Sequence, residues 1–220
     1  MKLGHKLILL AALTFFIGCK GSAGKWTGDT DCWKPLFDGR TLNGWVTRGG
    51  NATYHVEDNA IVGTAIREKQ NTFLCTEQHY SDFILELEFK IDTGLNSGVQ
   101  IRSNSFADYR DYRVHGYQVE IDPSERAWTG GIFDEGRRDW LFDLEQNEPA
   151  RKAFKPDQWN HFRIEAVGDS IKTWLNRTLA ADLTDSMTAS GFIALQVHGV
   201  ENDLGLQVRW RNLRIQDHSN

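Results

Sequence analysis

The strict alternation of side chains in residues 83–91 most constrains how this chain can fold. Every odd-numbered residue from Phe83 to Ile91 is large and apolar, and Glu86, Glu88 and Lys90 stand between them. Successive side chains of a β-strand point to opposite faces, whereas a helix needs apolar residues three and four positions apart. The segment therefore predicts a strand with one face on a core and the other in solvent.

The same alternation returns in further short segments along the chain. Turn-forming Gly, Asn and Asp residues separate these segments, and only residues 148–154 favour a short helical turn. Many short strands without a long helix are typical of an antiparallel β-sandwich. We therefore expect an all-β fold of two antiparallel sheets. The further strands expected cover residues 99–102, 117–121, 162–166, 171–175, 193–197 and 206–210.

The first residues predict a targeting segment and not a part of the fold. Lys2 and Lys6 precede an apolar run at residues 7–17, which is shorter than the roughly 20 residues that span a bilayer. The run ends at Gly18-Cys19, which favours cleavage before Cys19 and attachment of lipid to its thiol. An ordinary secreted protein with an incidental cysteine is the alternative.

This interpretation divides the 220 residues into three parts: a lipoprotein signal peptide (1–18), a lipidated N-terminus and tether (19–32), and one folded domain (33–217). It places the protein in the bacterial cell envelope, held to a membrane by its lipid. Loss of Lys2 and Lys6 would take the formal net charge from −5 to about −7, which argues against a nucleic-acid partner.

The cysteines leave two interpretations of the domain open. Cys32 and Cys75 remain after removal of the leader, and they could form one disulfide. Cys75 follows the apolar pair Phe73-Leu74, so a buried free thiol fits equally well. No metal-type spacing is present, and we expect neither a metal nor a cofactor.

The residues that alternate with the apolar positions indicate a binding face. Several expected strands carry amides, carboxylates, an arginine, a histidine or an indole there. Sugar hydroxyls need paired donors and acceptors, and the C–H faces of sugars stack on aromatic rings. If these strands are neighbours, the face has the chemistry of a saccharide cleft; a polar outer face with structural hydrogen bonds is the alternative. These residues are Gln100, Arg102, Gln118, Glu120, Asp122, Lys172, Trp174, Asn176, Gln196 and His198.

Six separated motifs follow one another along the chain. They are Phe-Asp-Gly at 37–39, Gly-Trp at 44–45, Asn-Ser-Gly-Val-Gln-Ile-Arg at 96–102, Gly-Tyr-Gln-Val-Glu-Ile-Asp at 116–122, Trp-Asn at 159–160 and Gly-Phe-Ile-Ala-Leu-Gln-Val-His-Gly at 191–199. In this order they resemble the 3-keto-disaccharide hydrolase family, and the resemblance covers residues 34–215. It implies a concanavalin A-like jelly-roll sandwich that cleaves glycosides already oxidised at C3. It also implies a functional partner that makes the substrate, a sugar 3-dehydrogenase.

The implied chemistry defines roles for the polar residues. A ketone at C3 acidifies the C2 proton, so the reaction needs a base, donors for the enolate oxygen and an acid for the leaving oxygen. Glu120 and His198 are the expected base and acid, in either order. The expected substrate-binding residues are Gln100, Arg102, Gln118, Asp122, Trp174, Asn176 and Gln196.

Two other functions stay open. Residues 120–125 spell E-x-D-x-x-E, similar to the catalytic strand of family 16 β-glucanases, although Pro123 would end or bulge such a strand. A saccharide-binding lipoprotein would need the amides and indoles but no acid–base pair. The charged run from Asp134 to Arg138 is either a substrate loop or, as we favour, a solvated stretch.

Overall fold

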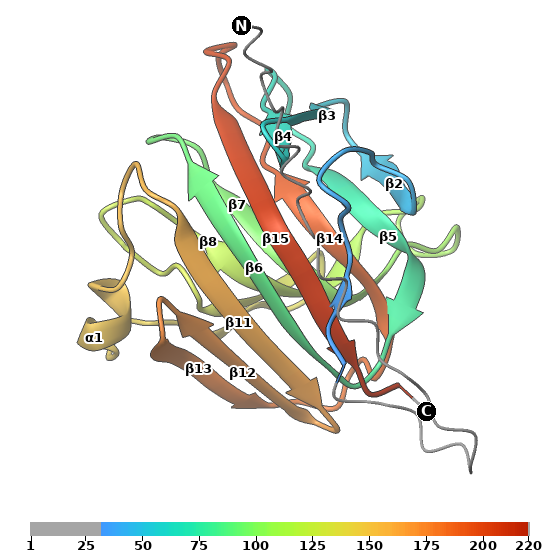
Figure 1. Ribbon diagram of the computed structural model, residues 1–220, viewed down its shortest axis with the longest axis vertical. Helices are drawn as coiled ribbons and strands as arrows, with labels where there is room; N and C mark the ends of the chain where they lie inside the picture. The colour runs from blue at the N-terminus through green and yellow to red at the C-terminus, as the bar shows by residue number, and fades with distance from the viewer. Residues whose placement is uncertain (1–31, 220) are drawn as a thin grey trace, which may run out of the picture.

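The computed structural model describes residues 32–219. Within them the chain forms two antiparallel sheets packed face to face, which confirms the expected all-β sandwich of the jelly-roll type. Figure 1 looks onto the eight-stranded sheet, and the seven-stranded sheet lies behind it.

The eight-stranded sheet is built around β6, the strand with the strict alternation. Its bounds, Phe83–Ile91, are those expected from the sequence, and every second side chain is buried. In sheet order the strands are β13 (Thr178–Thr184), β12 (Ser170–Leu175), β11 (Asn160–Val167), β6, β15 (Gln207–Asp217), β4 (Ala60–Thr64) and β3 (Thr53–Glu57), with β1 (Lys34–Pro35) paired to β15.

The seven-stranded sheet has β7 and β14 near its middle. Both strands contain segments expected from the sequence, as does the neighbouring β8. In sheet order the strands are β10 (Asp139–Phe142), β9 (Ile132–Glu135), β8 (His115–Ile121), β7 (Ser97–Asn104), β14 (Gly191–Val197), β5 (Thr72–Tyr80) and β2 (Trp45–Gly49).

The hydrophobic core fills the space between the two sheets. Leu85 and Leu87 of β6 face Val99 of β7 and Val119 of β8 in one continuous cluster of buried side chains. Trp210 of β15 is its largest fully buried member. The apolar half of each alternating strand thus forms the core, and the other half is left for the two outer faces.

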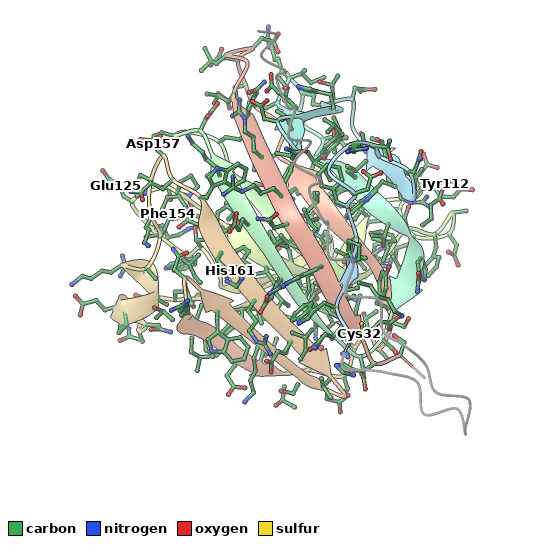
Figure 2. The ribbon with its side chains drawn as sticks, in the orientation of Figure 1. Cys32, Tyr112, Glu125, Phe154, Asp157 and His161 are labelled. Atoms are coloured by element: carbon green, nitrogen blue, oxygen red, sulfur yellow. The ribbon has the colours of Figure 1, made fainter. Side chains whose placement is uncertain are left out.

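The two outer faces differ in how open they are. On β6 the outward positions are half-buried, as expected of a solvated face. On β7, β8 and β14 the outward positions are as buried as the inward ones. The outer face of the seven-stranded sheet is therefore recessed. The loops around it include residues 105–114 and 122–131, whose Tyr112 and Glu125 stand at opposite sides of the view in Figure 2.

Two smaller expectations concern the helix and the cysteines. The short helix is confirmed as α1 (Glu148–Arg151), with the side chain of Asn147 accepting from the Ala150 amide as its N-cap. Cys75 is a buried free thiol, and burial raises its pKa to about 12. It packs as an apolar residue beside Phe73 and Phe192.

The expected signal peptide and lipid-bearing Cys19 lie outside the described residues. Among residues 32–219, no helix is both long and apolar enough to cross a membrane.

Candidate active site

The pairing register brings the outward polar residues into two adjacent rows. Gln100 of β7 lies opposite Gln118 of β8. In the next row Gln196 of β14 lies opposite Gly98 of β7, which in turn lies opposite Glu120 of β8. Three amides and one carboxylate from three strands therefore share one patch of the outer face, as the sequence pattern predicted.

Gly98 makes the close approach of these side chains possible. A Cβ atom there would lie 2.5 Å from Cδ of Gln118, well inside van der Waals contact. The absence of a side chain leaves a gap between Gln196 and Glu120, and Gln118 occupies it.

The three amides and Glu120 form one hydrogen-bond network that branches at Gln118. Gln100 Nε2 donates to Gln118 Oε1 at 2.6 Å, and Gln196 Nε2 donates to the same oxygen at 2.8 Å. Gln118 Nε2 then donates to Glu120 Oε2 at 2.9 Å. Gln196 Oε1 is buried without a hydrogen-bond partner, so this acceptor is available to a ligand hydroxyl or a water molecule.

A small pocket opens over these amides, and we call it the amide pocket. Its volume is about 180 Å³. His198, expected from the sequence as the second catalytic group, is exposed at its edge, and its Nδ1 lies 2.7 Å from the Gly199 carbonyl oxygen. The lining residues are Asn71, Asn96, Gln118, Glu120, Arg126, Phe133, Glu135, Trp140, Gln196 and His198.

Glu120 is the most perturbed acid of the pocket. Its side chain accepts from Asn96 Nδ2 at 2.5 Å and from Gln118 Nε2 at 2.9 Å, and the residue is 4% exposed. Burial raises its pKa from 4.5 to about 7, against the opposing effect of these two hydrogen bonds. A carboxyl that titrates near neutrality can serve as a general base or acid.

Glu135 is a second buried acid of the pocket, and the sequence interpretation did not place it there. It is 6% exposed, and burial raises its pKa despite opposing effects of Arg113, His198 and Asn71. The short strand β9 alternates so that Ile132 faces the core and Glu135 faces outward. The alternation of Ile132, Phe133, Asp134 and Glu135 was readable from the sequence, but the charged residues that follow made the segment look like a solvated run.

Asp122 acts on the pocket through Arg126. Its carboxylate accepts from Arg126 Nε at 2.7 Å and from the Ser124 amide at 3.1 Å. Burial would raise the pKa of Asp122, but these hydrogen bonds outweigh it and the pKa is lowered. The guanidinium carbon of Arg126 lies 4.7 Å from the ring centre of Trp128 and 5.0 Å from that of Trp140. Trp140 thereby forms an aromatic wall of the pocket.

The expectation that Arg102 shares this face is wrong. A register shift between Ile101 and Asn104 interrupts the β7–β8 ladder, and Arg102 has a φ of 46°, in the left-handed region. The buried guanidinium instead donates to the Ser81 and Gly168 carbonyl oxygens at 2.6 and 2.7 Å and pairs with Asp82 at 2.9 Å. The Arg102 guanidinium thus links the turn at residues 81–82 to the turn at Gly168.

Trp174 and Asn176 do not join the site either. Both line a depression on the outer face of the eight-stranded sheet, together with His161, which Figure 2 labels on the sheet nearest the viewer. The Asn176 amide donates to the Ala153 carbonyl oxygen at 2.8 Å and accepts from the His161 amide at 2.9 Å. The sequence correctly predicted which side chains of β12 point outward, but β12 belongs to the eight-stranded sheet and not to the sheet that carries the amide pocket.

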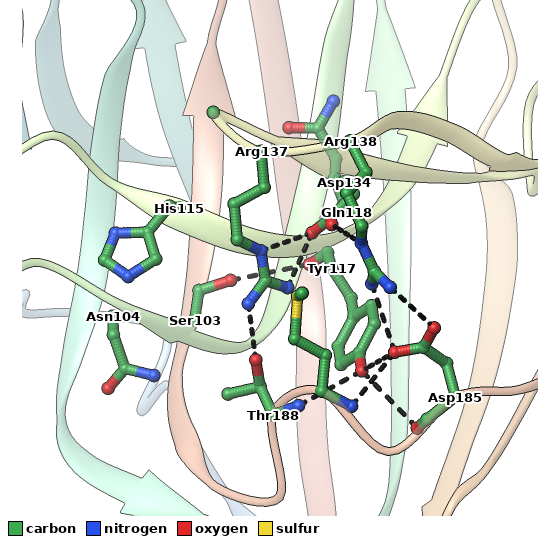
Figure 3. Close-up of polar contacts among 12 residues, drawn as sticks. Ser103, Asn104, His115, Tyr117, Gln118, Asp134, Arg137, Arg138, Asp185 and Thr188 are labelled. Carbon is green, nitrogen blue, oxygen red and sulfur yellow. Dashed lines mark hydrogen bonds and ion pairs between the residues drawn. The ribbon is translucent and has the colours of Figure 1, made fainter. Parts of the chain in front are cut away.

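The charged run at 134–138 is not the solvated stretch that we favoured: Glu135 lines the amide pocket, and its charged neighbours form an ion network around Asp134. Asp134 is fully buried and accepts from Arg137 Nε at 2.7 Å and from Arg138 Nε at 2.5 Å. Arg138 also pairs with Asp185, to which the Tyr117 hydroxyl donates. Figure 3 shows this network joining the start of the β9–β10 turn to the loop before β14.

Within residues 32–219, no three His, Cys, Asp or Glu side chains are grouped so that they could hold a metal ion. The side chains that line the amide pocket offer hydrogen bonding, aromatic stacking and proton transfer.

The jelly-roll sandwich is an architecture found in lectin domains, viral capsid proteins and cupins, so the fold alone does not define the function. A family model described as the 3-keto-α-glucoside-1,2-lyase-like domain matches residues 32–216. The chain belongs to this family, and its function is glycoside-related. No curated protein matches the chain.

Solved structures share the fold at low sequence identity. A candidate glycosyl hydrolase from Parabacteroides distasonis is 18% identical, with a TM-score of 0.59, over 86% of this chain and 94% of that one. A galectin-like protein of unknown function from Bacillus subtilis is 10% identical, with a TM-score of 0.60, over 84% and 97%. A carbohydrate-binding module from Bacillus subtilis is 20% identical, with a TM-score of 0.54, over 77% and 93%.

Proposed function

We propose that this protein cleaves the glycosidic bond of 3-keto-glycosides, including 3-keto-disaccharides, by elimination followed by addition of water. The observation that carries this function is Glu120, a buried carboxyl whose pKa of about 7 allows it to exchange a proton at neutral pH. The description of the family, a 3-keto-α-glucoside-1,2-lyase-like domain, supports the elimination step of this proposal.

The elimination needs only groups that the pocket contains. The carboxylate of Glu120 removes the C2 proton, which the C3 ketone has made acidic, and an enolate forms. Amide donors of the kind that surround Glu120, such as Asn96 and Gln118, suit stabilisation of the developing oxyanion. His198, at the edge of the pocket, remains the second candidate for proton transfer. Water then adds to C1, and the net result is hydrolysis.

A glucanase-type double displacement has less support. It would need Glu125 near Glu120, since retaining enzymes place their two carboxyl groups about 5–5.5 Å apart. β8 ends at Ile121, and Glu125 is exposed in the following turn and does not line the amide pocket. Asp122 between them is held by Ser124 and Arg126.

The test compares a 3-keto disaccharide with the same disaccharide before oxidation. Purified protein should cleave only the first, because only the ketone makes the C2 proton removable. Glu120→Gln keeps the shape but loses the base, and we expect kcat to fall by about 10²–10⁴-fold. The exposed Glu125→Gln is the matched control and should keep full activity.

Other results would point to other functions. Cleavage of the unoxidised sugar, with loss of activity in Glu125→Gln, would favour the glucanase mechanism. Tight binding of a saccharide by the wild-type protein with no turnover of either sugar would favour a binding module, a function that several proteins of this fold perform.

A further inference from the structure

A second pocket adjoins the amide pocket, and we call it the loop pocket. Its volume is about 300 Å³, and it lies between the loop that precedes β5 and the loop that joins β7 to β8. The two pockets share only Asn71 and Glu135 among their lining residues. The loop pocket is lined by Gly49, Lys69, Gln70, Asn71, Phe73, Arg110, Asp111, Arg113, Val114 and Glu135.

Glu135 is held at the boundary by contacts on both sides. Its Oε1 lies 3.3 Å from Arg113 Nη2, a group of the loop pocket, and its Oε2 lies 3.4 Å from Gln196 Nε2, a group of the amide pocket. β9 places Glu135 opposite Gly116, a residue without a side chain, so nothing on that neighbour competes for the space.

The contacts of Glu135 with Arg113 and Gln196 are long for hydrogen bonds, which usually measure about 2.7–3.2 Å, and the Asn71 side chain makes a further hydrogen bond to it. A carboxylate has about four acceptor positions, so these contacts leave Glu135 the capacity to engage a ligand. Burial raises the pKa of Glu135, so the carboxyl holds a proton more readily than an exposed glutamate does. His198, the alternative acid, is exposed to solvent at the edge of the amide pocket.

We propose that Glu135 is the catalytic acid that protonates the leaving oxygen, and that the loop pocket receives the leaving alcohol or sugar. This role rests on the proposed function. A substrate with its oxidised ring over Glu120 and its leaving group in the loop pocket would place the glycosidic oxygen at the boundary, beside Glu135. Glu120 is linked to that boundary through the amides of Gln118 and Gln196.

The proton transfers balance over the whole reaction. Glu120 takes the C2 proton, and the electron pair of that bond forms the enolate. The enolate pair then forms the C1–C2 double bond as the C1–O bond breaks, and the leaving oxygen takes the proton of Glu135. When water adds to C1, its proton goes to the Glu135 carboxylate, and Glu120 returns a proton to C2. Neither an oxidant nor a reductant is required.

The experiment varies the leaving group of the substrate. A 3-keto-glucoside with a methanol or sugar leaving group needs an acid, whereas one with 4-nitrophenol leaves readily without protonation. Glu135→Gln should lose about 10²–10⁴-fold in kcat on the poor leaving group and less than about tenfold on 4-nitrophenol. Glu120→Gln should lose activity on both, because both need the base.

A second measurement needs no variant. Wild-type kcat/KM on the poor leaving group should fall at high pH as the acid ionises, whereas on the 4-nitrophenyl substrate that fall should be absent. Equal losses on both substrates in Glu135→Gln, or a loss restricted to the poor leaving group in His198→Ala instead, would overturn the assignment. Failure of the wild-type protein on every 3-keto substrate would instead reject the proposed function itself.

Discussion

At the scale of single residues, burial sets the chemistry of Glu120. Its two hydrogen-bond donors favour the charged form, yet the raised pKa of about 7 means that desolvation outweighs them. Carboxyls with strongly raised pKa values concentrate at functional sites, where stability is given up for reactivity. Glu120 should therefore weaken the fold at the pH at which it works.

This cost predicts a pH-dependent difference in stability. The pKa of Glu120 in the folded state is raised from 4.5 to about 7. The contribution of its protonated carboxyl to the free energy of unfolding is therefore fully present below pH 4.5 and is lost as the pH rises through 7. One pKa unit corresponds to about 1.4 kcal/mol, so wild-type protein should lose about 2–3 kcal/mol more than Glu120→Gln between pH 5 and pH 8. Denaturant unfolding of both proteins at the two pH values checks this. Parallel pH profiles would contradict the raised pKa.

The same scale shows where sequence reasoning worked and where it could not. Alternation placed Gln100, Gln118 and Glu120 on one face because their strand segments are regular. It failed at Arg102, where a positive φ turns the side chain away. A local bulge of this kind depends on the packing of neighbouring turns, so the alternation of polar and apolar residues cannot predict it.

At the scale of elements, the buried ion network fixes the hairpin of β9 and β10. Asp134 faces inward between two arginines, and the next residue, Glu135, faces outward into the amide pocket. Arg137 also donates to the Thr188 hydroxyl at 2.5 Å. The network thus anchors the strand that presents Glu135, through the loop that precedes β14.

Asp134→Asn tests that anchor. Removing one partner of a buried ion pair leaves its counter-charge uncompensated, so we expect a loss of about 3–5 kcal/mol in the free energy of unfolding. Glu148→Gln is the matched control, because Glu148 and Lys152 form an ion pair in which both side chains are more than 70% exposed. Such a pair contributes about 0–1 kcal/mol. A loss for Asp134→Asn no larger than that of the control would mean that the network does not hold the hairpin.

Elements with long regular alternation were predictable, and short polar ones were not. β6 matched its expected bounds, whereas the four-residue strand β9 was hidden by its charged sequence. Membership of a sheet was also beyond the pattern. β12 and β8 alternate in the same way, yet the register pairs β12 with β11 and β8 with β7 on opposite layers.

At the scale of the whole molecule, the sandwich separates two kinds of surface. The outer face of the eight-stranded sheet is half-buried and carries partly buried ion pairs such as Arg214–Glu86 and Arg163–Glu165. The outer face of the seven-stranded sheet is recessed and carries both proposed acid–base groups, Glu120 and Glu135.

The anchor predicted from Gly18-Cys19 is the last testable expectation, and it concerns residues outside the described part of the chain. Replacing Cys19 by Ser should abolish incorporation of a fatty-acid analogue and release the protein from membrane fractions, because two or three acyl chains hold a protein durably where one does not. Cys32→Ser is the control and should keep both label and membrane association. Labelling that persists in Cys19→Ser would show that the lipid, if present, is attached elsewhere. Loss of label only in Cys19→Ser would place the mature N-terminus at Cys19 and leave residues 20–31 as the link between lipid and domain.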